Sequence, residues 1–145
     1  DELNRLKVLY SMNEEDTKII DNIIHTATIE NSDLSKYPNW IVYKFRHTML
    51  NYLDELIKTV CFGNTVYIRD NTTYNQRRTY WNNAISLCYA TLNYLTYVKI
   101  ILSELNLNIF ENFILNLDRE ISLLNGIKNK DSKRYFNIKD KIKKH

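Results

Sequence analysis

The side chains best suited to chemistry in this sequence are basic and aromatic, and they gather near its middle. Arginines are interspersed with aromatic residues over positions 69–81, as Arg69, Tyr74, Arg77, Arg78, Tyr80 and Trp81. Guanidinium groups pair with phosphates and aromatic rings stack on bases, so this combination is typical of surfaces that bind single-stranded nucleic acid. The plainer interpretation is a solvated start of a helix.

A second basic region closes the sequence. Residues 128–145 carry eight basic and two acidic side chains, a net charge of +6, whereas residues 1–127 carry a net charge of −3. The candidate contacts in this region are the basic residues nearest its start, Lys128, Lys130, Lys133 and Arg134. Such a segment is either an arm that binds polyanions, with contacts that weaken strongly in salt, or a solvated end of the chain.

No arrangement of residues in the sequence predicts catalysis or a metal centre. Asp21 and His25 are spaced as two ligands on one helix face, but zinc or iron needs three or four groups, and no Glu-x-x-His pair is present. The two glycines are far apart, so they cannot form a loop that cradles phosphate, and no Gly-x-Ser-x-Gly motif occurs. We therefore expect a non-enzymatic protein without a metal or cofactor.

The cysteines and the tyrosines each allow two interpretations of their role. Cys61 and Cys88 fall on apolar stripes and are expected to be reduced core thiols, with a disulfide between neighbouring helices as the alternative. The eleven tyrosines either flank the core with their hydroxyls in water or anchor a protein–protein contact. A protein partner is therefore expected, with RNA or single-stranded DNA as a further candidate.

The elements that position these residues are expected to be helices. Apolar residues recur every three or four positions, and only Pro38, Gly63 and Gly126 interrupt the pattern. Strands joined by hairpins would need far more glycine, proline and Asn-Gly or Asp-Gly pairs. We predict three long helices, each ended by a breaker or by polar residues, at residues 38–63, 74–105 and 108–126.

Shorter segments complete the predicted arrangement. An amphipathic turn or helix is expected at residues 2–10 and a longer helix at residues 13–31. Residues 64–73 are expected to form the longest and most mobile connection. The turn at residues 106–108 is so short that the two helices it joins should be antiparallel neighbours.

The predicted fold is therefore all-α, an antiparallel four-helix bundle with a short N-terminal helix and a basic C-terminal extension. Residues 1–127 are expected to form one bundle domain, and residues 128–145 a tail with a weak helix that orders on contact. No apolar run reaches the roughly 18–20 residues that cross a bilayer, and no signal peptide opens the chain. The cytoplasm is thus the default location and no membrane partner is expected, although Asp1 leaves room for a missing upstream piece.

The stretch from residue 47 to residue 129 resembles a known family. Three segments carry the resemblance, MLNYLDELI at 49–57, LNYL at 92–95 and LDREISLLNG at 117–126. They are similar to the four-helix-bundle family of the accessory variability determinants of diversity-generating retroelements and the ribosomal-RNA intervening-sequence proteins. The resemblance implies a basic, ring-shaped homo-oligomer that binds a reverse transcriptase and its RNA.

Three functions follow as hypotheses. The first is a helical adaptor that binds a protein partner and nucleic acid, with the aromatics of the 74–105 helix and Arg69, Arg77 and Arg78 as contacts. The second is a pure protein-interaction bundle that uses an apolar groove between helices. The third is a subunit of a larger assembly, in which the basic end reaches into RNA or a neighbouring chain.

Overall fold

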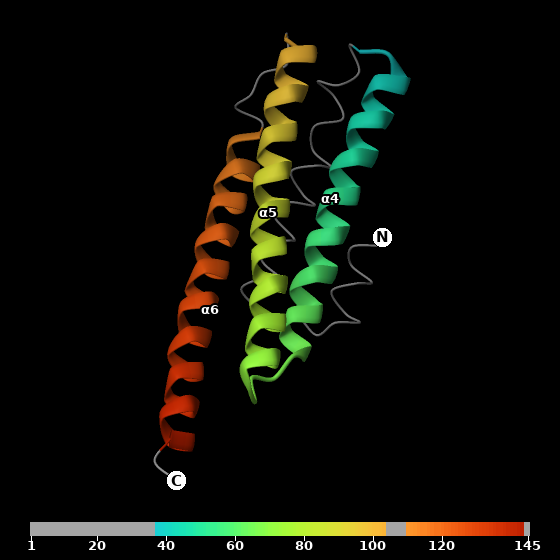
Figure 1. Ribbon diagram of the computed structural model, residues 1–145. Helices are drawn as coiled ribbons and strands as arrows, with labels where there is room; N and C mark the ends of the chain where they lie inside the picture. The colour runs from blue at the N-terminus through green and yellow to red at the C-terminus, as the bar shows by residue number, and fades with distance from the viewer. Residues whose placement is uncertain (1–36, 104–109, 144–145) are drawn as a thin grey trace.

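In the computed structural model, the described residues are 37–103 and 110–143, and within these ranges the chain forms three α-helices and no strand. Helix α4 spans Asn39–Thr65, α5 spans Asn71–Ile101 and α6 spans Glu111–Lys143. The three lie side by side, with α5 between the other two and antiparallel to both (Figure 1). The all-helical prediction is confirmed for this part of the chain. The helices expected at residues 2–10 and 13–31 lie outside the described residues, so the fourth helix stays a prediction.

The apolar stripes of α4 and α6 both pack against α5, and together the three helices enclose a shared core. Trp81 and Leu117 are fully buried in this core, and a smaller cluster of Phe45, Val98 and Leu102 lies where α4 begins and α5 ends. The larger cluster contains Leu53, Leu56, Ile57, Val60, Cys61, Trp81, Ala84, Cys88, Leu95, Phe113, Leu117, Ile121 and Leu124. Burial of each large apolar side chain contributes about 1.5–3 kcal/mol, so this shared interior is what holds the helices together.

Helix α5 begins three residues earlier than the spacing predicts because of a capping box. The Asp70 carboxylate accepts a hydrogen bond from the Thr73 backbone N–H at 2.8 Å, and the Thr73 hydroxyl oxygen accepts one from the Asp70 N–H at 3.1 Å. The Thr73 amide also lowers the pKa of Asp70. The connection to α4 is therefore residues 66–70 and not 64–73, and the burial of Ile68 anchors it.

Helix α6 does not end at Asn125–Gly126, so that prediction was wrong. It runs without a break to Lys143 and crosses the expected boundary between residues 127 and 128. A single glycine costs an exposed helix about 1 kcal/mol relative to alanine, which does not end a helix that tertiary contacts support. Buried Leu124 before Gly126 and buried Asp131 after it keep the same side of α6 against the core. The described part of the basic segment thus continues this helix, which is packed on α5 as far as Tyr135.

Gly63 is also not a helix terminator, because α4 continues to Thr65. Its backbone lies directly against the Trp81 ring, and a Cβ on Gly63 would stand 2.8 Å from two ring carbons. Glycine is required here by the close approach of the indole. At Gly126, by contrast, a Cβ would meet nothing within 4 Å.

These two glycines give a matched test of the packing. We expect Gly63→Ala to destabilise the protein by about 1–3 kcal/mol, because the buried indole cannot move aside. Gly126→Ala should stabilise it by up to about 1 kcal/mol, because alanine favours the helix and meets no obstacle. Urea unfolding of both variants measures the difference. Equal stability changes in the two variants would contradict the contact between Gly63 and Trp81.

Candidate nucleic-acid interface

A buried carboxylate on α6 connects the two basic regions, residues 69–81 and residues 128–143. Asp131 on α6 accepts two hydrogen bonds on its Oδ2 atom, from Arg77 Nε at 2.7 Å and from Trp81 Nε1 at 2.7 Å. The Arg77 Nη1 group donates to the carbonyl oxygens of Gly63 and Val66, each at 3.1 Å, and the guanidinium lies 4.9 Å from the centre of the Trp81 ring. These contacts connect α4, the 66–70 connection, α5 and α6 through one side chain.

A second polar network lies beside this ion pair. The Tyr74 hydroxyl is 2.8 Å from the Ser132 hydroxyl, and Arg78 Nη1 donates to both oxygens at 3.1 and 3.3 Å. The Tyr74 ring stacks on the Tyr135 ring with centroids 4.3 Å apart and planes within 6°. The Tyr135 hydroxyl then donates to the Asn71 side-chain oxygen at 3.0 Å. The start of α5 is thereby fastened to α6.

The predicted arginine and tyrosine contacts therefore divide into inner and outer groups. Arg77 is engaged in the ion pair, and Tyr74 and Arg78 are engaged between α5 and α6. Tyr80 is half-buried with its ring against Phe62 at 6.2 Å, whereas Arg69 is exposed in the connection. These five residues do not form one surface.

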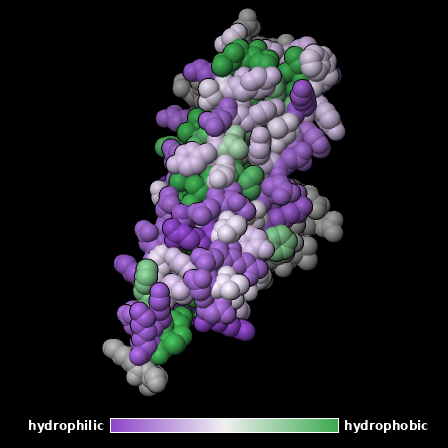
Figure 2. Space-filling view, viewed as in Figure 1, coloured by the Kyte–Doolittle hydropathy of each residue, from purple (hydrophilic) through white to green (hydrophobic). Residues whose placement is uncertain are grey.

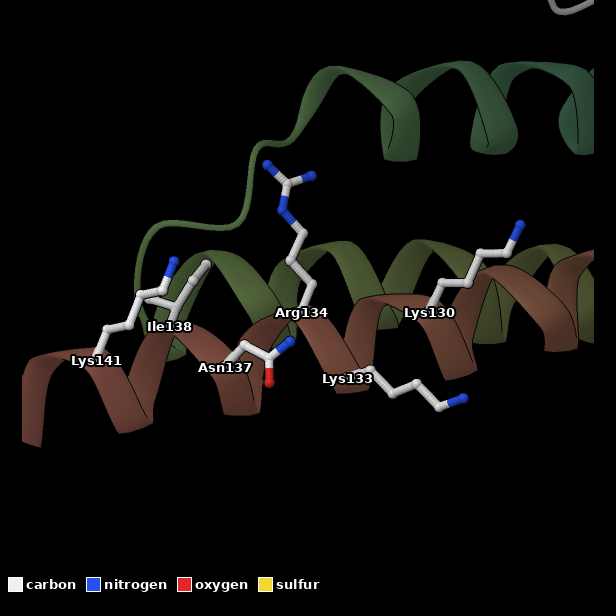
Figure 3. Close-up of a pocket in the computed structure, with 6 residues that line it drawn as sticks. All are labelled: Lys130, Lys133, Arg134, Asn137, Ile138 and Lys141. Carbon is white, nitrogen blue, oxygen red and sulfur yellow. The ribbon is translucent and has the colours of Figure 1, made fainter.

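The predicted lysines and arginine of the basic segment do come together, except for half-buried Lys128. An open hollow of about 550 Å³ lies along one side of α6 and is lined by Lys130, Lys133, Arg134, Asn137, Ile138 and Lys141 (Figure 3). We call these six residues the basic face. Lys130 and Arg134 point toward α4 and the connection, whereas Lys133 points away from them (Figure 3). Because all six come from one helix at spacings of three and four, its backbone sets their positions.

Sequence reasoning missed Asp131, Ser132 and Tyr135, which hold this face in place. Their signal was present in the pattern, since Leu124, Asp131 and Tyr135 continue one side of a helix through Gly126. It was hidden because Asp and Ser are not core residue types. A buried tryptophan N–H needs an acceptor, and this need could have pointed to an acid.

The remaining candidate chemistry is limited within the described residues. Among residues 37–103 and 110–143, no three His, Cys, Asp or Glu side chains lie together as a metal site would need. Cys61 and Cys88 are buried and form no disulfide. Burial, with Glu120 as a second cause, raises the pKa of the Cys88 thiol to about 12. Helix α5 is long and apolar enough to cross a membrane by length and composition alone, a test that core helices also pass.

Comparison with known proteins yields no relative. No family model, no curated protein and no solved structure matches the chain. The function must therefore be argued from the geometry of the chain itself.

The ion pair at Asp131 can be tested directly. We expect Asp131→Ala to lower the free energy of unfolding by about 3–5 kcal/mol, because it leaves the largely buried Arg77 without its counter-ion and the Trp81 N–H without an acceptor. Asp140→Ala, an exposed change of the same type on the same helix, should alter it by no more than about 0.5 kcal/mol. Urea unfolding followed by tryptophan fluorescence measures both. Equal changes in the free energy of unfolding of the two variants would show that the ion pair does not stabilise the packing of the helices.

The Cys88 thiol gives a prediction about pH. Its pKa in the folded protein, about 12, lies above its ordinary value of 9.0. Between these values the unfolded chain has lost the proton and the folded chain retains it, so stability should fall as pH rises. In a Cys61→Ala variant, the Cys88 thiol should resist alkylation by iodoacetamide at pH 10 in the native protein and react after unfolding in urea. Alkylation of the native protein at pH 10 as fast as that of the unfolded chain would contradict this burial.

Proposed function

We propose that this protein is a non-enzymatic helical adaptor that binds single-stranded nucleic acid along the basic face of α6 and also binds a protein partner. The observation that carries the proposal is the unbroken course of α6 to Lys143, which turns a charged segment into an ordered surface. Lys130 and Lys141 mark the ends of the basic face and are about 16 Å apart along the helix axis. That length is enough for contacts to several successive phosphates.

The charge of this face is higher than the sequence suggests. Asp131 is the acid nearest to Lys130 and Lys133, but its carboxylate is turned inward and paired with Arg77. Its negative charge therefore does not offset the neighbouring lysines at the surface. Exposed ionic contacts contribute about 1 kcal/mol or less each, so binding would need several of them together and would weaken in salt.

Exposed aromatic rings near the basic face favour unpaired bases over a duplex. Phe136 is 57% exposed on α6, and Tyr67 is 67% exposed in the connection that also carries Arg69. The connection passes beside the basic face (Figure 3), and Arg77 ties it to α6 through Val66 and Asp131. Bases without a pairing partner can stack on such rings.

The family resemblance expected of residues 47–129, to which no family model corresponds, would imply RNA as the polyanion and a second protein as the partner. Both would be bound by an adaptor of this kind. A homo-oligomer is compatible with the proposal and is not needed for it.

A pure protein-interaction bundle is the second candidate. It is favoured by large apolar side chains exposed where α4 begins and α5 ends, at Trp40, Tyr43 and Ile100. Tryptophan and tyrosine are preferred anchors of protein–protein contacts. Absence of nucleic-acid binding would favour this candidate over the first.

Filter binding of a uridine oligonucleotide across a salt series tests the first proposal. We expect binding at low salt, with the logarithm of affinity falling linearly with the logarithm of salt concentration. The double variant Lys133→Glu/Arg134→Glu should reduce affinity by about tenfold or more and lower the salt slope by about 2.

The matched control for this assay carries the same charge change at the other end of the molecule. Lys44→Glu/Lys99→Glu alters two exposed lysines on α4 and α5 and should leave most of the affinity intact. Absence of binding at low salt, binding without a salt slope, or an equal loss in this control would discard the proposed interface.

A further inference from the structure

The side of α6 that packs on α5 continues past the beginning of α5. The Tyr135 hydroxyl bonds to Asn71, the first residue of α5, so residues 136–143 extend beyond that point. Eight residues of helix correspond to about 12 Å. Figure 1 shows this end of α6 projecting beyond the start of α5.

Two isoleucines continue the packing stripe onto this projection. The stripe passes from Asp131 and Tyr135, which contact α5, to Ile138 and Ile142 in steps of four, three and four residues. Ile142 is 67% exposed and Ile138 is half-buried. Figure 2 shows hydrophobic surface beside hydrophilic surface at this end of the molecule. The stripe thus continues an established interface beyond the helix that forms it.

The width and borders of the stripe indicate what could cover it. It is one residue wide at each turn, and exposed cations border it on both sides, as Arg134, Lys139, Lys141 and Lys143. A helix that lies on a membrane needs a broad apolar face. A narrow stripe instead fits between the ridges of other helices, and cations at its borders match carboxylates at the rim of such a groove.

We infer that the projecting end of α6 is a docking helix for a partner protein that presents an apolar groove between helices, with Asp or Glu along both rims. Ile138 and Ile142 enter the groove, and the bordering cations pair with the rim carboxylates. This inference rests on the adaptor proposal in that it names the surface and chemistry of the protein partner. The docking surface shares Arg134, Ile138 and Lys141 with the basic face. It differs from that face in using Ile142, whose removal takes away no charge.

Titration calorimetry with the full chain and a designed helical hairpin tests the inference. The hairpin carries leucines along its groove and glutamates along both rims. We expect saturable binding that Ile142→Ala weakens by about tenfold, because one buried isoleucine anchor is lost. Phe136→Ala removes another exposed apolar side chain of the same projection, off the stripe, and should leave binding unchanged. A hairpin with lysine rims should not bind.

Three outcomes would overturn the inference. They are no saturable binding of the glutamate-rimmed hairpin up to about 1 mM, equal binding by the wild type and Ile142→Ala, and equal binding of the lysine-rimmed hairpin. Filter binding of the uridine oligonucleotide to Ile142→Ala separates this failure from that of the proposed function. If Ile142→Ala weakens binding of the oligonucleotide alone, or weakens binding of the oligonucleotide and the hairpin equally, the stripe belongs to the nucleic-acid site and the inference is wrong. Retained oligonucleotide binding together with weakened hairpin binding supports it.

Discussion

The packing of the three helices where α4 ends and α5 begins depends on one buried carboxylate. Asp131 cannot be desolvated alone, because an unpaired charge in the interior costs several kcal/mol. Arg77 and Trp81 both donate to its Oδ2 atom, and Arg77 in turn satisfies two carbonyl oxygens at the end of α4. The guanidinium is therefore also held in one place, since moving it would break its hydrogen bonds to Asp131, Gly63 and Val66. Asp131, Arg77 and Trp81 therefore hold one another in position through their hydrogen bonds.

The sequence pattern predicts much of the fold because apolar spacing is a local property. Helices α4 and α5 and the first half of α6 all follow from residues that recur every three or four positions. The capping box at Asp70 was readable in the sequence and was missed. The meaning of the two glycines was not readable, because it depends on what lies across the core. Gly63 is needed by the ring of Trp81, 18 positions further on, whereas Gly126 faces open space.

The candidate site was predictable only where charge alone decides the position. Lys130, Lys133 and Arg134 lie on the surface, as expected of solvated cations, and their spacing on α6 gathers them. Arg77 was predicted to be a contact residue together with Arg69 and Arg78, but it is engaged in the ion pair. Its partner Asp131 lies 54 positions away, and no local pattern connects the two residues. The separation of inner from outer arginines is therefore a tertiary property.

A helix as rich in lysine as the end of α6 has no strong apolar stripe to decide which side faces the core. Turning it by one residue, about 100°, would bring Lys130 or Ser132 toward Trp81 and place Asp131 in water. A turn in either direction would leave the Arg77 charge without its partner, so the ion pair favours one rotation of the helix. An apolar replacement for the whole cluster could be equally stable, since buried ion pairs are weak evidence for stability. It would not select a rotation in the same way. The orientation of both the basic face and the isoleucine stripe thus follows from the inward-facing Asp131 together with Ser132 and Tyr135, which fasten the same part of α6 to α5.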